Sequence, residues 1–112
     1  MKFKVPRVFY IKGKKWTMRF ADLSGVTKEN SEHTGLYGET NFDKREVLIE
    51  KTLNTKDHPR LLEEVVMHEL THCMLFELHF SQVENFTPDI EEILCDGFAD
   101  LVQSTLRKYF YR

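Results

Sequence analysis

One stretch constrains the fold of this chain more than any other. Residues 59–80 carry apolar side chains around nearly the whole circumference of a predicted helix. At the helical repeat, Leu61, Val65 and Phe76 fall on one side, and other apolar residues cover much of the rest. Pro59 suits the first turn, where the missing N–H of proline costs nothing. A helix that is apolar nearly all round is buried at the centre of its domain.

The same helix contains the run His68-Glu69-Leu70-Thr71-His72. Residues four apart lie on one face of a helix, so the two imidazoles can hold a single tetrahedral metal ion. The glutamate after the first histidine can then reach a water on that metal, which is the HExxH pattern of zinc hydrolases. Buried polar groups need partners, and a metal ion would supply one to all three side chains.

A catalytic zinc usually takes three protein ligands and keeps one position open, so a third ligand is required. One known source is a histidine further along, in the extended pattern HExxHxxGxxH. Here Leu75 stands at the glycine position and Leu78 at the last histidine position, while His79 misses by one residue. The sequence therefore excludes the extended histidine pattern.

The other source is a glutamate from the last predicted helix, residues 90–109. Glu91 and Glu92 are both candidates, and we favour Glu92 because Asp96 follows four residues later on the same face. Glu92 can then bind the metal while Asp96 accepts a hydrogen bond from the second nitrogen of a ligand histidine. Glu91 remains the alternative. The predicted core face of this helix is apolar: Leu94, Phe98, Leu101, Val102 and Leu106.

Together these two segments resemble a known family. HELTH followed by Glu92-Ile93-Leu94-Cys95-Asp96-Gly97-Phe98-Ala99 is similar to the ImmA/IrrE type of zinc metallopeptidase, within the gluzincin class. That type has HExxH and then a helix of the form ExxA(N/D)xFAxxL. In this chain Cys95 stands where alanine is usual, and Val102 stands where the final leucine is usual. The resemblance covers residues 61–106 well and residues 1–60 only in outline.

The resemblance implies a zinc-dependent endopeptidase with one Zn²⁺ per chain. Its metal ligands would be His68, His72 and Glu92, with water in the fourth position. Glu69 would take the proton of that water and pass it to the leaving amine. The substrate would be a protein or peptide, such as a regulatory protein, bound along the edge strand predicted from Leu36 to Phe42. Gly35 and Gly38 would allow close approach of its backbone. Three weak candidates could stabilise the oxyanion: His33, Tyr109 and Tyr111.

The fold predicted for residues 1–112 is a single α+β, zincin-like domain. A small antiparallel or mixed sheet of about four strands comes first, followed by the zinc-binding helix and the glutamate helix. Four short segments are rich in β-branched and aromatic residues or alternate between apolar and polar residues, and they are the predicted strands: 5–11, 16–20, 36–42 and 46–52. Residues 12–15 form a predicted turn, and residues 21–35 a long polar loop.

Composition adds little about partners or location. The 16 basic and 18 acidic residues give a net charge of −2, which favours no partner class. We expect a cytoplasmic protein, because the N-terminus has no apolar leader segment and no run is long enough to span a membrane. Cys73 and Cys95 do not make a disulfide framework and are expected to be reduced, buried thiols. A thiol at position 95, beside the zinc, leaves inhibition or redox sensitivity open.

A second function remains open for the N-terminal hairpin. Residues 1–20 hold seven basic residues and no acidic one, with Phe9 and Trp16 interleaved. The alternative is therefore a non-catalytic regulatory module, in which zinc is structural and the hairpin binds a partner protein or nucleic acid. Without a recognised nucleic-acid motif, a solvated hairpin face is the favoured interpretation. Glu69 also argues for catalysis, because a structural site needs no general base.

Overall fold

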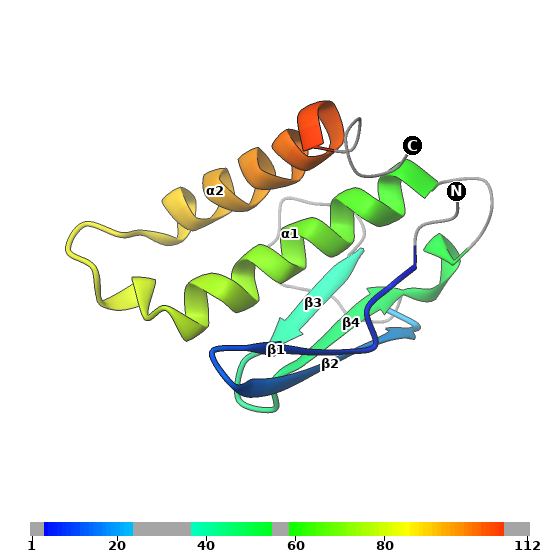
Figure 1. The fold of residues 1–112 in the computed structure, drawn as a ribbon, viewed down its shortest axis with the longest axis horizontal. Helices are drawn as coiled ribbons and strands as arrows, with labels where there is room; N and C mark the ends of the chain where they lie inside the picture. Colours follow the sequence, from blue (N-terminus) through cyan, green and yellow to red (C-terminus); the bar gives the residue numbers. More distant parts are fainter. Residues whose placement is uncertain (1–3, 24–36, 55–58, 107–112) are drawn as a thin grey trace.

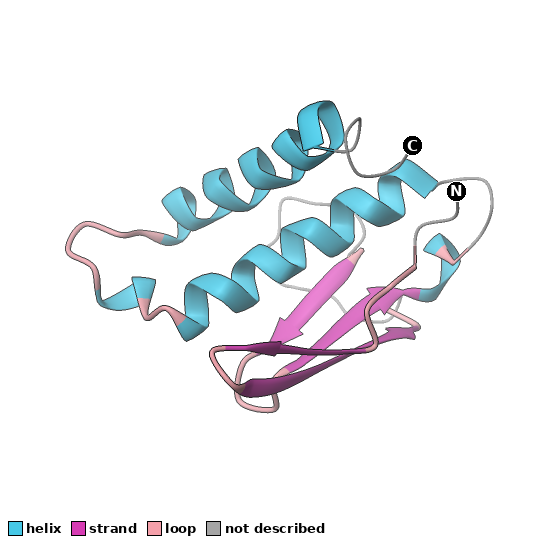
Figure 2. Ribbon diagram, in the orientation of Figure 1, coloured by secondary structure: helices cyan, strands magenta, loops and turns pink. Residues whose placement is uncertain are grey.

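The computed structural model describes residues 4–23, 37–54 and 59–106, and its elements stack in three layers (Figure 1). A four-stranded sheet forms the first layer, and α1 (Pro59–Glu77) lies across one of its faces. The second helix, α2 (Pro88–Leu101), runs antiparallel to α1 on the side away from the sheet (Figure 2). The prediction of an α+β fold, with a small sheet followed by two helices, is confirmed.

The sheet is mixed, with the strand order β1-β2-β4-β3. Its strands are β1 (Val8–Ile11), β2 (Lys14–Ala21), β3 (Gly38–Asn41) and β4 (Glu46–Glu50). β1 and β2 form an antiparallel hairpin, β2 and β4 run parallel, and β3 pairs antiparallel with β4. β3 therefore lies at one edge of the sheet, as the sequence predicts for this strand.

The strand ends differ from those predicted. The first turn consists of only Lys12 and Gly13, both at positive φ (51° and 78°), so β2 already begins at Lys14. The wider turn predicted over residues 12–15 is wrong, because two residues at positive φ suffice to reverse a hairpin. At the other end, β4 stops at Glu50 and passes into the short 3₁₀ turn η1 (Lys51–Leu53).

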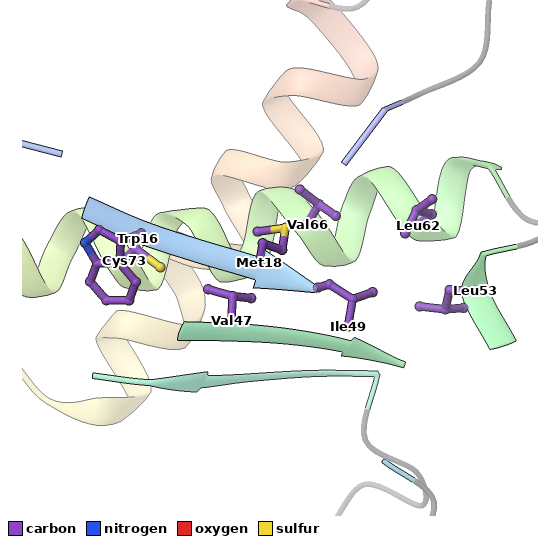
Figure 3. Close-up of a cluster of buried hydrophobic side chains, with 8 residues drawn as sticks. All are labelled: Trp16, Met18, Val47, Ile49, Leu53, Leu62, Val66 and Cys73. Carbon is purple, nitrogen blue, oxygen red and sulfur yellow. The ribbon is translucent and has the colours of Figure 1, made fainter. Parts of the chain in front are cut away.

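Apolar residues of the sheet and of α1 form the core. Alternating side chains of two neighbouring strands point to one face of the sheet, where they pack against α1. Figure 3 shows the cluster: Trp16 and Met18 from β2, Val47 and Ile49 from β4, Leu53 from η1, and Leu62, Val66 and Cys73 from α1. This period-2 alternation is what fixes the register of a half-buried strand. One face of α1 therefore packs against the sheet.

The first helix ends, and the second begins, earlier than predicted. α1 stops at Glu77 rather than at residue 80, and His79 then takes a left-handed conformation (φ 59°) before the 3₁₀ turn η2 (Phe80–Gln82). α2 starts at Pro88, where the hydroxyl of Thr87 accepts a hydrogen bond from Ile90 N at 3.2 Å. It continues as a π-helical turn, η3 (Val102–Leu106). Residues 107–109 of the predicted helix lie outside the described part of the chain.

The core face predicted for α2 is wrong at three of its five positions. Leu94, Phe98 and Leu101 are 42%, 38% and 46% exposed, whereas the fully buried side chains of α2 are small, namely Cys95 and Ala99. Val102 is buried as predicted, and the side chain of Leu106 is outside the described residues. The helix is turned so that its carboxylates, rather than its largest apolar residues, face α1. Within the described residues, no helix is long and apolar enough to cross a membrane.

Candidate metal centre

The centre lies between the two helices, on the face of α1 that points away from the core. His68 and His72 are one turn apart on α1, and their Nε2 atoms are 3.2 Å from each other. The rings meet at an interplanar angle of 67° with centroids 4.9 Å apart. Both side chains are largely covered, with 23% and 12% of their surface exposed. The two histidines that the sequence predicts as ligands therefore converge on one point.

Glu92 of α2 joins the two imidazoles. One carboxylate oxygen is 3.1 Å from His68 Nε2, and the other is 3.0 Å from His72 Nε2. Around a tetrahedral zinc with bonds of about 2.05 Å to nitrogen and oxygen, neighbouring ligand atoms are about 3.3 Å apart. The two nitrogens are 3.2 Å apart, and each is 3.0–3.1 Å from a different oxygen of the Glu92 carboxylate, so these separations are close to that value and involve both oxygens. Two imidazole nitrogens and one carboxylate therefore surround a point where a metal ion could be held.

The outer nitrogens of both rings meet carboxylates as well. His68 Nδ1 is 2.8 Å from Asp96 Oδ1, and His72 Nδ1 is 2.5 Å from Glu91 Oε2. Asp96 thus lies where the sequence places it, against the second nitrogen of a candidate ligand. Glu92 and Glu91 lie against different nitrogens: Glu92 faces the inner nitrogens of both rings, and Glu91 faces the outer nitrogen of His72. Carboxylates in such outer positions fix the tautomer and the orientation of a metal-binding imidazole.

This arrangement calls for positive charge at its centre. When each Nδ1 carries the proton and donates it to a carboxylate, both Nε2 atoms present lone pairs to each other and to Glu92. Lone pairs and a carboxylate within 3.2 Å repel unless a proton or a metal cation lies among them. Because Glu91, Glu92 and Asp96 add three carboxylates around two imidazoles, the centre is electrostatically matched to a divalent ion.

Glu69 lies beside the histidines, turned toward the edge strand β3. Its side chain is buried, and Thr40 Oγ1 donates a hydrogen bond of 2.7 Å to its Oε2. Burial raises the pKa of Glu69 above its ordinary value, while the hydrogen bond from Thr40 and the nearby imidazoles act in the opposite direction. A carboxylate kept partly dehydrated and oriented in this way is suited to accept a proton.

Gly38 of β3 makes this position of Glu69 sterically accessible. A Cβ added at Gly38 would lie 2.8 Å from Glu69 Oε1 and 2.9 Å from its Cγ, closer than non-bonded carbon atoms approach. From the sequence, Gly38 is expected to let a substrate backbone come close to the strand. In the structure, the group that lies close to Gly38 is the side chain of Glu69. Neither this contact nor the bond from Thr40 could be found in the sequence, because β3 and α1 are joined only by tertiary packing.

Cys95 completes the cluster from the side of α2. One ligand atom from each of His68, His72 and Cys95 lies within 4.8 Å of the others, a group that could hold a metal ion. The Cys95 thiol is fully buried, and burial together with the neighbouring carboxylates raises its pKa to about 12. Cys73 is equally buried but belongs to the hydrophobic core. The expectation that both thiols are buried is confirmed, and only Cys95 is at the centre.

The structure leaves other residues considered from the sequence untested. His33, Gly35, Tyr109 and Tyr111 lie outside the described residues. The basic hairpin β1–β2 occupies the opposite edge of the sheet from β3. No family model, no curated protein and no solved structure matches this chain. Its chemistry therefore has to be inferred from the centre itself.

Proposed function

We propose that this protein is a zinc-dependent metallopeptidase, similar to the ImmA/IrrE type of gluzincin. The observation that carries the proposal is the convergence of His68 Nε2, His72 Nε2 and the Glu92 carboxylate within 3.2 Å, with Glu69 oriented beside them. Two imidazole nitrogens and a carboxylate oxygen are the ligand set of many hydrolytic zinc enzymes. Imidazole ligands favour zinc over magnesium or calcium, which prefer oxygen alone.

The residues of the chain have separate tasks in this proposal. His68, His72 and Glu92 would hold the zinc, which when bound supplies a Lewis acid that polarises a carbonyl and acidifies water. Asp96 and Glu91 hold the two imidazoles in the orientation that binds metal. Glu69 accepts a proton from the attacking water and later gives it to the leaving amine, a role that its dehydrated carboxylate supports.

β3 supports the proposal from the substrate side. It is an edge strand, and Thr40 on it contacts the proposed general base at 2.7 Å. An extended peptide that added to this edge would lie next to Glu69. The proposed substrate is therefore an extended segment of a protein or peptide, and a regulatory protein is one such substrate.

The test separates metal binding from catalysis. Metal analysis of the purified, reconstituted protein should give one zinc per chain, and Glu69→Gln should retain that zinc. The same variant should slow cleavage of a peptide found by library screening by at least about 100-fold, because general base catalysis contributes that much or more. Glu64→Gln, an exposed position on the same helix, is the matched control and should cleave normally. Wild-type rates in Glu69→Gln would contradict the proposed mechanism.

A second function has one observation in its favour. Cys95 lies in the same cluster as the two histidines, and closed sites with four protein ligands are typical of structural zinc. The protein would then be a zinc-stabilised, non-catalytic module that binds a partner protein or nucleic acid through its basic hairpin. This alternative predicts that library screening finds no cleaved peptide and that Cys95→Ser does not reveal one.

A further inference from the structure

Cys95 is the one buried reactive side chain at the centre that the proposed peptidase chemistry does not use. It lies on the same face of α2 as Glu92, one helical turn away, and its thiol is fully buried. Its sulfur is within 4.8 Å of ligand atoms of both histidines. In a tetrahedral site with a zinc–sulfur bond of about 2.3 Å, sulfur and nitrogen ligands are about 3.6 Å apart. Each sulfur–nitrogen separation would therefore have to shorten by at most about 1.2 Å, the difference between 4.8 Å and about 3.6 Å.

We propose that Cys95 Sγ is the fourth ligand of this metal ion and keeps the peptidase latent. The closed set would be His68, His72, Glu92 and Cys95. This proposal rests on the proposed function, because it takes the other three ligands from there. With sulfur in the fourth position, the water that Glu69 must deprotonate has no place on the metal, so cleavage requires that the sulfur first leaves.

The burial of Cys95 makes this exchange intramolecular. The side chain already faces the two imidazoles, so binding orders only one short side chain and competes favourably with a water from solution. As the metal–sulfur bond forms, the S–H bond breaks and its proton passes to solvent. When water returns to the metal, the sulfur takes up a proton again, and no oxidant or reductant is consumed.

Withdrawal of the Cys95 sulfur from the metal requires a movement of α2, and the packing of α2 allows such a movement. Within the described residues α2 packs chiefly against α1, and its buried side chains are small, namely Cys95 and Ala99. Glu92 is 55% exposed, so the side of the centre that carries this ligand is open to solvent. A small displacement of α2 would withdraw the sulfur while the flexible, solvent-facing carboxylate of Glu92 follows the metal.

Cys73 provides a matched control thiol. It follows His72 directly on α1, yet its side chain points into the core beside Trp16 (Figure 3). Both thiols are fully buried. Any effect that depends on the mere presence of a buried thiol should therefore appear in both variants, whereas metal ligation should appear at Cys95 alone.

The test uses Co²⁺ in place of zinc in the full chain, because a cobalt–thiolate bond gives an intense charge-transfer band in the near ultraviolet. Wild type and Cys73→Ala should bind one equivalent of Co²⁺ and show this band together with the visible bands of tetrahedral cobalt. Cys95→Ser and Cys95→Ala should bind cobalt with the visible bands but lose the charge-transfer band. Circular dichroism checks the folding of each variant, and the serine variant preserves the size of the side chain.

The outcomes distinguish this proposal from the proposed function. Zinc affinity should also fall by at least about 10-fold in Cys95→Ser, since loss of even an outer partner costs that much. One equivalent of bound cobalt without the charge-transfer band in wild type would overturn ligation by Cys95 and leave the peptidase proposal standing. A band that persists in Cys95→Ser would overturn it equally. Failure of the wild type to bind either metal would instead overturn the proposed function.

Discussion

The two faces of α1 are held to their neighbours by different kinds of interaction. Toward the sheet, Leu62, Val66 and Cys73 pack into a continuous apolar core. Toward α2, His68 and His72 meet carboxylates, at distances between 2.5 and 3.1 Å. One face therefore supplies the stability of the domain, and the other supplies a charged centre whose stability depends on what it binds. Of the two free cysteines in the described chain, Cys73 lies on the sheet face of α1, and Cys95 lies on α2, opposite the other face.

Loss of a metal ligand should give the largest effect on the α2 face. His68→Ala should weaken zinc binding by more than about 100-fold, which exceeds the loss expected for an outer partner. The sheet face should be unaffected, so the chelator-treated variant and the chelator-treated wild type should unfold at similar urea concentrations. Isothermal titration calorimetry measures the zinc affinity, and urea unfolding measures the stability of the metal-free proteins. A large loss of stability in the chelated variant would show that the two faces are not independent.

A substitution on the other face of α1, the one toward the sheet, should affect stability and leave metal binding unchanged. Leu62 is 6% exposed, so Leu62→Ala should lower the free energy of unfolding by about 2–5 kcal/mol, through lost burial and the cavity that remains. Leu94→Ala, at 42% exposure on the outer side of α2, is the control and should cost under about 1 kcal/mol. Chemical unfolding measures both. Zinc affinity of the folded Leu62→Ala protein should match wild type, and a marked loss would contradict the separation of roles.

A smaller effect is expected from the outer carboxylates. Asp96→Asn keeps the size of the side chain but removes the charge that faces His68 Nδ1 at 2.8 Å. It should reduce zinc affinity by about 10- to 100-fold, the usual cost of losing such a partner. Asp100→Asn, one turn later on the exposed side of α2, should leave the affinity unchanged. Equal losses in both variants would point to general electrostatics rather than to orientation of the imidazole.

The smallest effect should come from a carboxylate of the sheet that serves structure only. Glu50 accepts hydrogen bonds from Leu23 N at 2.9 Å and Thr52 N at 2.8 Å, and these bonds lower its pKa below 4.5. Its stabilising contribution is present above that ordinary value and is lost as pH falls through the lowered pKa of the folded state. Glu50→Gln should therefore be less stable than wild type at neutral pH, and this difference should shrink near about pH 3.

Urea unfolding at both pH values measures this difference, with Glu84→Gln, an exposed position, as the control. A difference that grows on acidification would reverse the sign of the predicted linkage. Zinc binding should not change in either variant, because Glu50 lies on the sheet and outside the centre. This result would extend the comparison to carboxylates: Glu91, Glu92 and Asp96 on α2 face imidazoles, and Glu50 on β4 faces backbone N–H groups.

The sequence predicts most of the fold because strong periodicity survives in the final structure. Val47 and Ile49 alternate on β4 as expected, and Pro59 opens α1 as expected. The prediction from periodicity fails for α2, where Leu94 and Phe98 are expected in the core and are instead exposed. Apolar periodicity identifies the helix face that is expected to be buried. In α2, however, the side that faces α1 carries the carboxylates that contact the histidines.

For the candidate centre, the sequence could place only what a helix brings together by itself. The spacing of His68 and His72, and that of Glu92 and Asp96, is local and could be read directly. The contact of Thr40 with Glu69 spans 29 positions, and the contact of His72 with Glu91 depends on the exact rotation of α2. Both are products of tertiary packing, and only the structure reveals them.

The stacking of α2 on α1, rather than on the sheet, has a consequence for hydrogen exchange. A helix that rests on one neighbour through small side chains can open without unfolding the core, and its amides then report that local opening. A ligand that binds only the closed arrangement suppresses such opening in proportion to its saturation, by about 100-fold when its concentration is 100 times its dissociation constant. Zinc should therefore slow exchange in α2 far more than in β2 or β4, so that metal availability sets how long α2 stays closed on α1.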